Sequence, residues 1–155
     1  MAPQPKVSVQ ANNFDVSVET AHLTESSRNI GAIVSFTGLC RDEGGQLAAL
    51  ELEHYPGMAE AKLTQIAKEA AQRWPLSGLT IIHRFGKIEP GANIVLVIAA
   101  SSHRRAAFEA AEFLMDFLKT DAPFWKKEHL IDGNSGDWVE AKDGDEADKK
   151  RWQQT

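Results

Sequence analysis

The chain has 155 residues and a formal net charge of −5 at pH 7. An acidic chain with no dominant basic face is not expected to bind nucleic acid, and its single cysteine, Cys40, excludes an internal disulfide framework and a cysteine-based metal cage. No run of about 18 apolar residues is present, so the sequence predicts no membrane span. The N-terminus has no apolar signal region, which favours a cytoplasmic protein. We expect one domain over residues 1–142 and a charged, mobile tail over residues 143–155.

Strands and helices are interspersed along the predicted domain. Period-two patterns and runs of β-branched residues predict strands, and apolar residues at i, i+3 and i+4 predict helices. In chain order, we expect a strand at 6–10, a helix at 15–27, strands at 30–40 and 46–55, a helix at 57–74, strands at 79–85 and 93–100, a helix at 102–119, and a late hairpin of 125–131 with 138–141. This order predicts either the α+β class or a mixed α/β sandwich.

Two glycines separate the second and third predicted strands. Gly44 and Gly45 lie in a short loop between residues 30–40, which are apolar and β-branched, and residues 46–55, which alternate between apolar and polar side chains. A Gly-Gly link between two strands is a common hairpin signal. We therefore expect these two strands to pair with each other as an antiparallel hairpin.

A concentration of cations in residues 101–128 stands out against the acidic background. It comprises His103, Arg104, Arg105, Lys119, Lys126 and Lys127. The first three fall in the first turn of the predicted helix, where cations oppose the positive end of the helix dipole. Helix N-termini and arginine forks both suit phosphate groups, so an anionic ligand would explain this placement. A solvated helix start without a ligand is the alternative, and the pattern by itself leaves both open.

Lys119 and Lys126 lie on either side of the end of the same helix. Lys119 falls in the last turn, where a cation stabilises the helix dipole without any further role. Lys126 follows Pro123, Phe124 and Trp125, which should hold it against an apolar wall. A desolvated lysine near other cations can act as a nucleophile or a base.

The length of the predicted helix limits how these cations can meet. His103 and Lys119 are 16 residues apart in the chain, which corresponds to about 24 Å at the rise of an α-helix. One small ligand cannot contact both within one chain. Either the two clusters are independent, or a homodimer brings His103 and Arg104 of one copy to the lysines of the other across a two-fold axis. We favour the composite site.

Further candidates lie at the end of the second predicted strand. Arg41 begins the glycine loop, and strand ends are common positions for site residues. Phe36 could flank a ring-shaped ligand, although core packing is the more ordinary interpretation. Cys40 is more simply explained by packing than as a sulfur nucleophile. His54 and His83 have no partners at metal-ligand spacing, so we expect no metal site.

Several segments resemble one protein family. They are VSFTGLCRDE, LELEHYPGMAE, RWPLSGLTIIHRFGKI, SSHRRAAFEAAEFLMDFLKTDAPFWKKE and WVEAKD. Their order and spacing are similar to those of the MoaE family, the large, catalytic subunit of molybdopterin synthase. The resemblance extends from about residue 30 to residue 142, and its most specific part is the HR…FLKT.APFWK pattern.

The resemblance implies a fold, an activity and partners. The fold would be α/β hammerhead-like, with an additional small antiparallel β subdomain. A homodimer would bind small ubiquitin-like sulfur-carrier subunits (MoaD-like) to give a heterotetramer. The carrier's C-terminal Gly-Gly tail would bear a thiocarboxylate, whose sulfur is transferred to cyclic pyranopterin monophosphate to form the molybdopterin dithiolene. The resemblance implies no metal and no cofactor for this sulfurtransferase step.

The resemblance also implies roles for the residues that match the family's motifs. Lys119 and Lys126 would be the catalytic lysines, with Lys119 at the end of the carrier's tail. The substrate-binding residues would be Leu39, Cys40 and Arg41 in the substrate loop, His103 and Arg104 from the neighbouring subunit, and Lys119, Lys126, Lys127 and Glu128 around the pocket. Phe36 and Lys142 are further candidates. Two features depart from the family's pattern: the loop after Arg41 is acidic and glycine-rich, and Lys142 stands where some relatives are expected to have arginine.

Other functions fit the bare pattern as well. A non-catalytic dimeric module that binds phosphorylated metabolites or a protein tail would keep the cation cluster and show no turnover. A scaffold protein would tolerate loss of Lys126 except in its salt-dependent binding.

Overall fold

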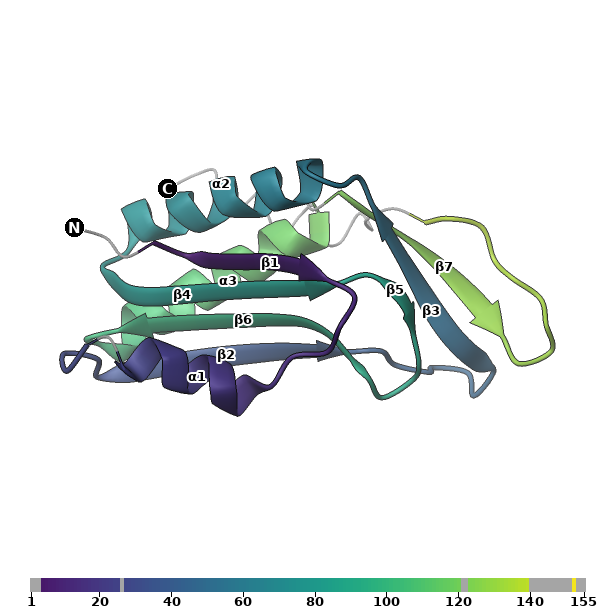
Figure 1. Ribbon diagram of the computed structural model, residues 1–155, viewed down its shortest axis with the longest axis horizontal. Helices are drawn as coiled ribbons and strands as arrows, with labels where there is room; N and C mark the ends of the chain where they lie inside the picture. The colour runs from purple at the N-terminus through teal and green to yellow at the C-terminus, as the bar shows by residue number, and fades with distance from the viewer. Residues whose placement is uncertain (1–3, 26, 121–122, 140–151, 153–155) are drawn as a thin grey trace.

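The computed structural model describes residues 4–25, 27–120, 123–139 and 152. In chain order, the elements are β1 (Lys6–Gln10), α1 (Val16–Glu25), β2 (Ala32–Leu39), β3 (Leu47–His54), α2 (Met58–Arg73), β4 (Leu76–Arg84), β5 (Gly86–Ile88), β6 (Asn93–Ser101), α3 (Arg104–Thr120) and β7 (Phe124–Leu130). The strands form two sheets, ordered β1-β4-β6-β2 in the larger and β5-β3-β7 in the smaller. Figure 1 shows the smaller sheet at one end of the larger one, where it crosses the general direction of the long strands.

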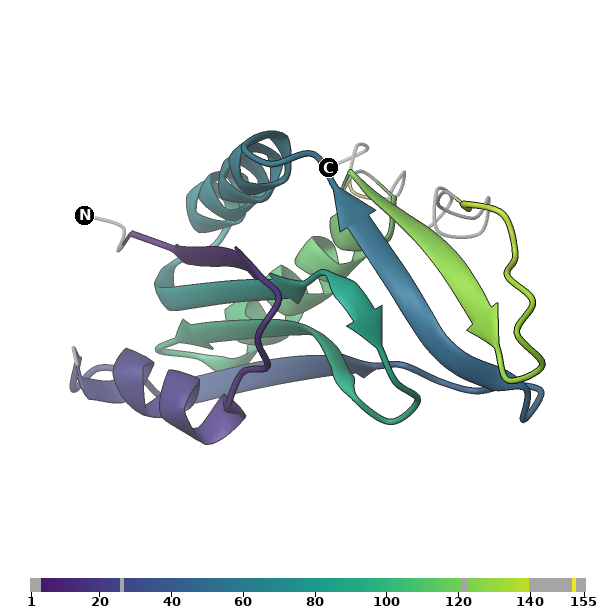
Figure 2. The same ribbon diagram turned by 45° about the vertical axis from the view of Figure 1, so that its right-hand side comes forward.

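The two central strands of the larger sheet, β4 and β6, hold the core. Both are buried along nearly their whole length. Side chains alternate between the faces of a sheet, so Ile81 and Val97 belong to a core cluster shared with α2 and α3. Ile82 and Leu96 belong to a second cluster with Phe14 and part of α1. Helices therefore cover both faces of the sheet, α2 and α3 on one and α1 on the other (Figures 1 and 2).

The α3 helix is amphipathic, and its apolar stripe determines which side of the helix packs on the sheet. Ala107, Ala110, Leu114 and Leu118 recur at helical spacing and are buried. Alanines at these positions let the helix axis approach the sheet closely. Lys119 lies outside this stripe and is exposed. Among the described helices, none combines the length and the apolar character that crossing a membrane requires.

The predicted hairpin between residues 30–40 and 46–55 is wrong. β2 pairs with β6, whereas β3 pairs with β5 and β7 in the other sheet. After β2, Cys40 forms backbone hydrogen bonds with Ala92 and Gly91 in the turn that precedes β6. The glycine loop therefore carries the chain from one sheet to the other. The alternating pattern of β3 specified a strand with one buried face, but not which later strands would pair with it.

The late hairpin is confirmed in part. Lys126 and Val139 exchange both backbone hydrogen bonds, at 3.1 and 2.8 Å, and Gly136 donates to the carbonyl of Glu128 at 2.9 Å. Residues 140–141 of the expected second strand lie outside the described residues. β4 begins at Leu76, three positions before the expected start, and β5 was not predicted at all.

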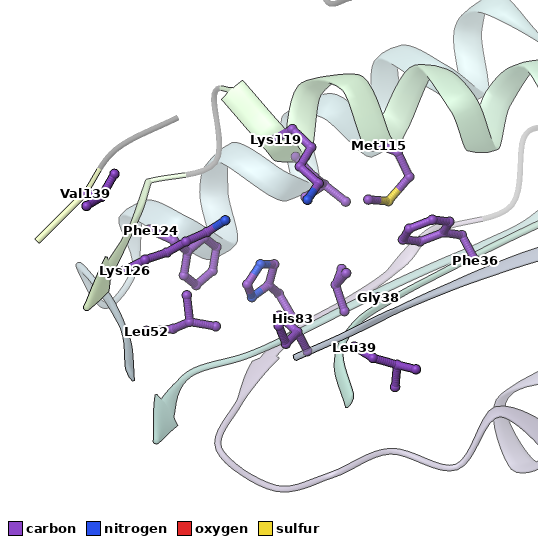
Figure 3. A pocket seen from close by; sticks show the side chains of 13 residues that line it. Phe36, Gly38, Leu39, Leu52, His83, Met115, Lys119, Phe124, Lys126 and Val139 are labelled. Carbon is purple, nitrogen blue, oxygen red and sulfur yellow. The ribbon is translucent and has the colours of Figure 1, made fainter. Parts of the chain in front are cut away.

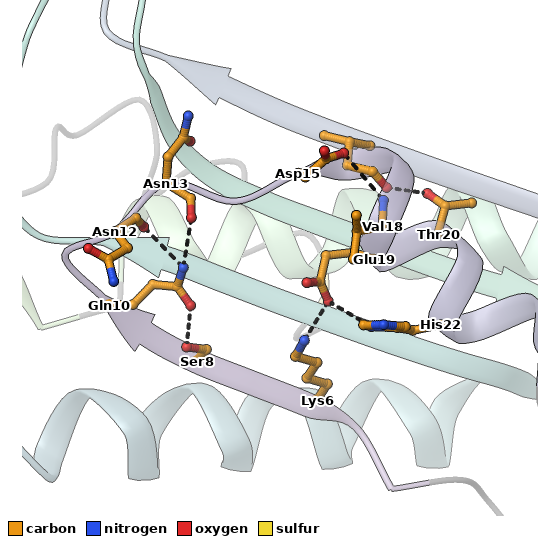
Figure 4. A network of polar contacts seen from close by, with 11 residues as sticks. Lys6, Ser8, Gln10, Asn12, Asn13, Asp15, Val18, Glu19, Thr20 and His22 are labelled. Carbon is orange, nitrogen blue, oxygen red and sulfur yellow. Dashed lines mark hydrogen bonds and ion pairs between the residues drawn. The ribbon is translucent and has the colours of Figure 1, made fainter.

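A polar network attaches α1 to the edge of the larger sheet (Figure 4). Asp15 caps the helix, because its Oδ1 accepts hydrogen bonds from the backbone N–H groups of Ser17 and Val18 at 2.9 and 3.3 Å. Glu19, one turn later, is largely buried and accepts from the Lys6 ammonium of β1 at 2.6 Å. A buried carboxylate needs such a partner. The pair therefore joins α1 to the edge strand β1.

The fold confirms the predicted α+β class with an additional small antiparallel sheet. The prediction of a mobile tail at 143–155 lies outside the described residues except for Trp152. The Trp152 ring packs edge-on against Trp74 and Phe113, with ring centroids 5.8 and 5.7 Å away. Its indole N–H donates to the carboxylate of Asp116. This residue therefore docks on α2 and α3.

Candidate functional site

A pocket lies where the end of the larger sheet meets the smaller sheet and the C-terminal end of α3. Its volume is about 110 Å³. Most of its wall is apolar, formed by Phe36, Leu39, Leu52, Ile94, Val95, Met115, Leu118, Phe124 and Val139. Among the lining residues of the described chain, the polar side chains are His83, Lys119 and Lys126. A narrow apolar cavity with a few convergent polar groups is the usual form of a ligand site.

The two lysines reach this pocket from different elements. Lys119 comes from the last turn of α3 and Lys126 from β7. In Figure 3, their ammonium groups point toward a common space above His83. Phe124 and Lys126 are two positions apart on a strand, so they share a face, and the predicted apolar wall beside Lys126 is present. The structure thus brings together the two residues that the sequence analysis named as catalytic.

His83 is a pocket residue that the sequence analysis considered only as a metal ligand. It is 8% exposed and lies near the end of β4. Its ring stacks on Phe124, with centroids 3.8 Å apart and planes 13° apart. Its Nδ1 is 2.9 Å from the carbonyl oxygen of Arg84. In the sequence, His83 is the single histidine of a largely apolar strand, and this pattern alone does not distinguish a site residue from a well-packed core residue.

The environment of His83 keeps its imidazole neutral. Burial lowers the pKa of His83 from 6.5 to about 4, and the nearby charges of Lys126, His54 and Lys119 act in the same direction. The hydrogen bond to the Arg84 carbonyl opposes this shift but does not cancel it. At neutral pH the ring therefore contributes a hydrogen-bonding surface and no charge.

This lowered pKa predicts a loss of stability in mild acid. Between pH 6.5 and about 4, the unfolded chain protonates at His83 while the folded chain does not. The free energy of unfolding should then fall as pH falls, by about 1.4 kcal/mol per pH unit and about 3 kcal/mol in total. Above pH 6.5 both states are neutral and this contribution is constant. Urea denaturation at several pH values, for the wild type and His83→Phe, measures the effect.

The comparison with His83→Phe isolates this single group. Phenylalanine can keep the stack on Phe124 and has no titrating nitrogen. Carboxylates that titrate over the same range affect both proteins and cancel in the difference. We expect the stability advantage of the wild type to shrink from pH 6.5 to pH 4. A difference that stays constant over this range would show that His83 has an ordinary pKa.

The predicted substrate loop is only partly in the pocket. Leu39 lines it and is 54% exposed, and Phe36 lines it and is 40% exposed. Core packing, the more ordinary interpretation of Phe36, is therefore wrong. Cys40 points the other way, into a small core with Leu52 and Ile88, and burial raises the pKa of its thiol. Arg41 is exposed and forms an ion pair with Glu43 of the acidic loop.

The cations at the start of α3 are far from the lysines. α3 is one continuous helix from Arg104 to Thr120, so the separation of about 24 Å between its ends holds. His103 and Arg104 are exposed. Arg105 forms an ion pair with Glu109 at 3.2 Å. Within the described residues, the structure thus gives a local partner to Arg105 and records none for His103 or Arg104.

The remaining predicted site residues either lie beside the pocket or fall outside the residues that the structure describes. Lys127 and Glu128 do not line the pocket. The Lys127 ammonium lies over the ring of Trp138, 5.4 Å from its centroid. Glu128 is exposed on β7. Lys142 lies outside the described residues. No group of three His, Cys, Asp or Glu side chains in the described ranges is placed to hold a metal ion.

Met115 and Leu118 complete the pocket wall and were also missed by the sequence analysis. Both lie on α3, one turn and one residue before Lys119. They belong to the apolar stripe of the helix, and in the sequence this stripe indicates only core. These two residues differ from the rest of the stripe because they lie at the C-terminal end of the helix, where they face the pocket.

Comparison with known proteins identifies relatives over most of the chain. A family model described as MoaE protein matches residues 9–121. The molybdopterin synthase catalytic subunit of Brucella melitensis is 64% identical over 148 residues, which is 96% of this chain and 91% of that protein.

Solved structures agree with this relationship. The molybdopterin biosynthesis MoaE protein of Burkholderia ambifaria has a TM-score of 0.83 and 45% identity, covering 96% of this chain and 98% of that one. Molybdopterin synthase of Staphylococcus aureus has a TM-score of 0.77 and 31% identity, covering 88% and 97% respectively. The similarity in sequence and in fold thus spans both sheets and the pocket between them.

Proposed function

This chain belongs to the MoaE family, and we propose that it is the catalytic subunit of a molybdopterin synthase, a sulfurtransferase of molybdenum cofactor biosynthesis. The sulfur would come from the thiocarboxylated C-terminus of a small carrier subunit and pass to cyclic pyranopterin monophosphate. The observation that carries this proposal is the pair of ammonium groups, Lys119 and Lys126, that converge on one narrow apolar pocket.

The shape and charge of the pocket support an extended anionic tail as one ligand. A cavity of about 110 Å³ has little room for side chains, and a Gly-Gly terminus has none. Apolar walls such as Phe124 and Met115 exclude water, which strengthens the attraction between an ammonium group and a thiocarboxylate. Lys119, at the end of α3, would meet the last atoms of the tail.

The second ligand carries a phosphate, and we propose that the neighbouring copy binds it. His103 and Arg104 are exposed at the N-terminal end of α3, about 24 Å from Lys119 of the same chain. In a homodimer with a two-fold axis, one copy's His103 and Arg104 would complete the other copy's pocket. With one carrier on each copy, the assembly is a heterotetramer.

The reaction needs cations because two anions must approach each other. The thiocarboxylate and the phosphate repel one another unless positive groups lie between and around them. Lys119 and Lys126 would hold the thiocarboxylate and move protons as its sulfur attacks the pterin side chain. The protein itself need not provide sulfur, in keeping with the buried position of Cys40.

A reconstituted assay tests the proposed function. The protein is mixed with a thiocarboxylated carrier subunit and cyclic pyranopterin monophosphate, and molybdopterin is measured over time. We expect product to form in proportion to the amount of this protein, and none with unmodified carrier. If a complex with the carrier forms but no product appears, the chain is a binding module and the enzyme assignment is wrong.

A further inference from the structure

His83 occupies the floor of the pocket in one fixed orientation. Its Nδ1 lies 2.9 Å from the Arg84 carbonyl oxygen. Because a carbonyl oxygen only accepts, Nδ1 carries the proton of the neutral ring, and Nε2 on the opposite edge is left with its lone pair.

The anchor of this ring is itself rigid. The Arg84 guanidinium donates to the carbonyl of Ala11 at 3.1 and 3.0 Å and to the carbonyl of Asn93 at 2.9 Å. These bonds tie the end of β4 to its neighbours. The stack on Phe124 restricts rotation of the imidazole. The position of Nε2 is therefore set by the backbone and not by a mobile side chain.

Among the described residues, no buried side-chain nitrogen or oxygen lacks a hydrogen-bond partner, so Nε2 is open to the pocket. An acceptor at the wall of a mostly apolar pocket is a favourable partner for a protein donor that reaches it. Among the pocket's lining residues in the described chain, only the two lysines have side chains that can donate. Lys126 is the better placed, because it lies on the same face of β7 as Phe124, which contacts the ring.

We propose that His83 is a positioning residue of this site, whose Nε2 accepts a hydrogen bond from the Lys126 ammonium and fixes it toward the reacting atoms. The charged and titratable groups that face the ring are Lys126, His54 and Lys119, in decreasing order of effect. The ring of His54 packs against Phe85 and Phe124, and its Nε2 lies 3.8 Å from Oε1 of Glu60. His54 is therefore engaged by other groups and is not the donor that we propose for Nε2 of His83. A neutral acceptor orients the ammonium without adding a third positive charge or removing any.

The consequence for catalysis rests on the proposed function. A lysine on a strand edge has four rotatable bonds, and its ammonium can point to solvent. A hydrogen bond to His83 would hold the ammonium in the pocket before any ligand binds. The positive charge would then already lie where the thiocarboxylate is to bind. Loss of the acceptor should therefore slow the reaction more than it weakens binding.

Nitrogen NMR on the protein alone tests the hydrogen bond itself. Imidazole ¹⁵N shifts of His83 are recorded at pH 8, where the ring is neutral. We expect protonated Nδ1 and an Nε2 shift typical of a hydrogen-bonded acceptor. Lys126→Ala should move the Nε2 signal to the position of a free acceptor and raise the pKa of His83 from about 4. Lys127→Ala, whose ammonium lies over Trp138, should change neither.

Either of two results would overturn the proposal. One is an Nε2 signal that stays in place in Lys126→Ala. The other is a signal that moves in Lys119→Ala instead. Both are readable whether or not the protein makes molybdopterin, so failure of the hydrogen bond is distinguishable from failure of the proposed function.

Kinetics of two His83 variants separate positioning from packing. His83→Phe retains the ring stack and loses the acceptor, whereas His83→Gln has an amide oxygen that can take the place of Nε2. We expect kcat to fall about tenfold or more in His83→Phe with KM little changed, and to recover substantially in His83→Gln. Equal activity of wild type and His83→Phe would show that the ring serves only packing.

Discussion

Replacing Lys119 by alanine should reduce the rate of molybdopterin formation by about a hundredfold or more, with little change in stability. The ammonium is one of two that converge on the pocket, and removing one positioned charge or proton donor from a reacting centre typically costs this much in rate. The side chain is exposed and outside the buried stripe of α3. Its contribution to folding is therefore limited to the helix dipole, a few tenths of a kcal/mol.

Initial rates and carrier affinity together check this expectation. The rate of Lys119→Ala is compared with that of Lys68→Ala, which removes an exposed lysine from α2 and should leave the rate near that of the wild type. The dissociation constant for the carrier, measured by calorimetry, should change much less than the rate. A Lys119→Ala protein that forms product at the wild-type rate would remove this lysine from the chemistry.

Two inactive variants should restore activity when they form one dimer. If the site is composite, a dimer of a Lys119→Ala chain with a His103→Ala chain contains one site that lacks both residues and one that lacks neither. A doubly tagged heterodimer, isolated by two affinity steps, should then have about half the wild-type rate per dimer. Each variant alone should form little product, because every one of its sites lacks a residue.

A matched pair of variants provides the control. Lys119 and Lys126 reach the same pocket from the same chain, so a heterodimer of Lys119→Ala with Lys126→Ala has no intact site and should stay inactive. Recovery in the first heterodimer and not in the second would demonstrate a shared site. If the first pair also fails to recover although heterodimers form, the lysines and the cations of α3 act independently.

The candidate site was predictable to the extent that it depends on local pattern. A proline, two aromatic residues and a run of cations close together in sequence drew attention to Lys126, whereas the role of Lys119 was implied by the resemblance to the MoaE family. The structure places both lysines in the pocket. Phe36 was harder, because an aromatic residue on an apolar strand has the same pattern whether the strand is covered or not. In the structure, Phe36 lines the pocket and its side chain is 40% exposed. This exposure follows from the position of the pocket and not from the sequence of the strand.

His83 shows why the rest of the site could not be predicted. Its neutral state depends on burial of the ring and on the charge of Lys126. Lys126, and Phe124 on which the ring stacks, come from a strand more than forty residues later in the chain. Neither effect leaves a mark in the sequence around His83. The pKa of a buried group is set by everything that surrounds it, so it is a property of the assembled fold.

The sequence by itself determined most of the elements, with β5 as the exception, because the periods of helices and strands are properties of the backbone and need only a few neighbouring residues. It also determined that the cations of α3 are separated by the length of one helix. Only the tertiary structure decided how the strands pair. β2 and β3 each had an edge able to accept several partners, and the choice of β6 for β2 and of β5 and β7 for β3 depends on which arrangement buries the most apolar surface at once. The pocket between the two sheets follows from that choice.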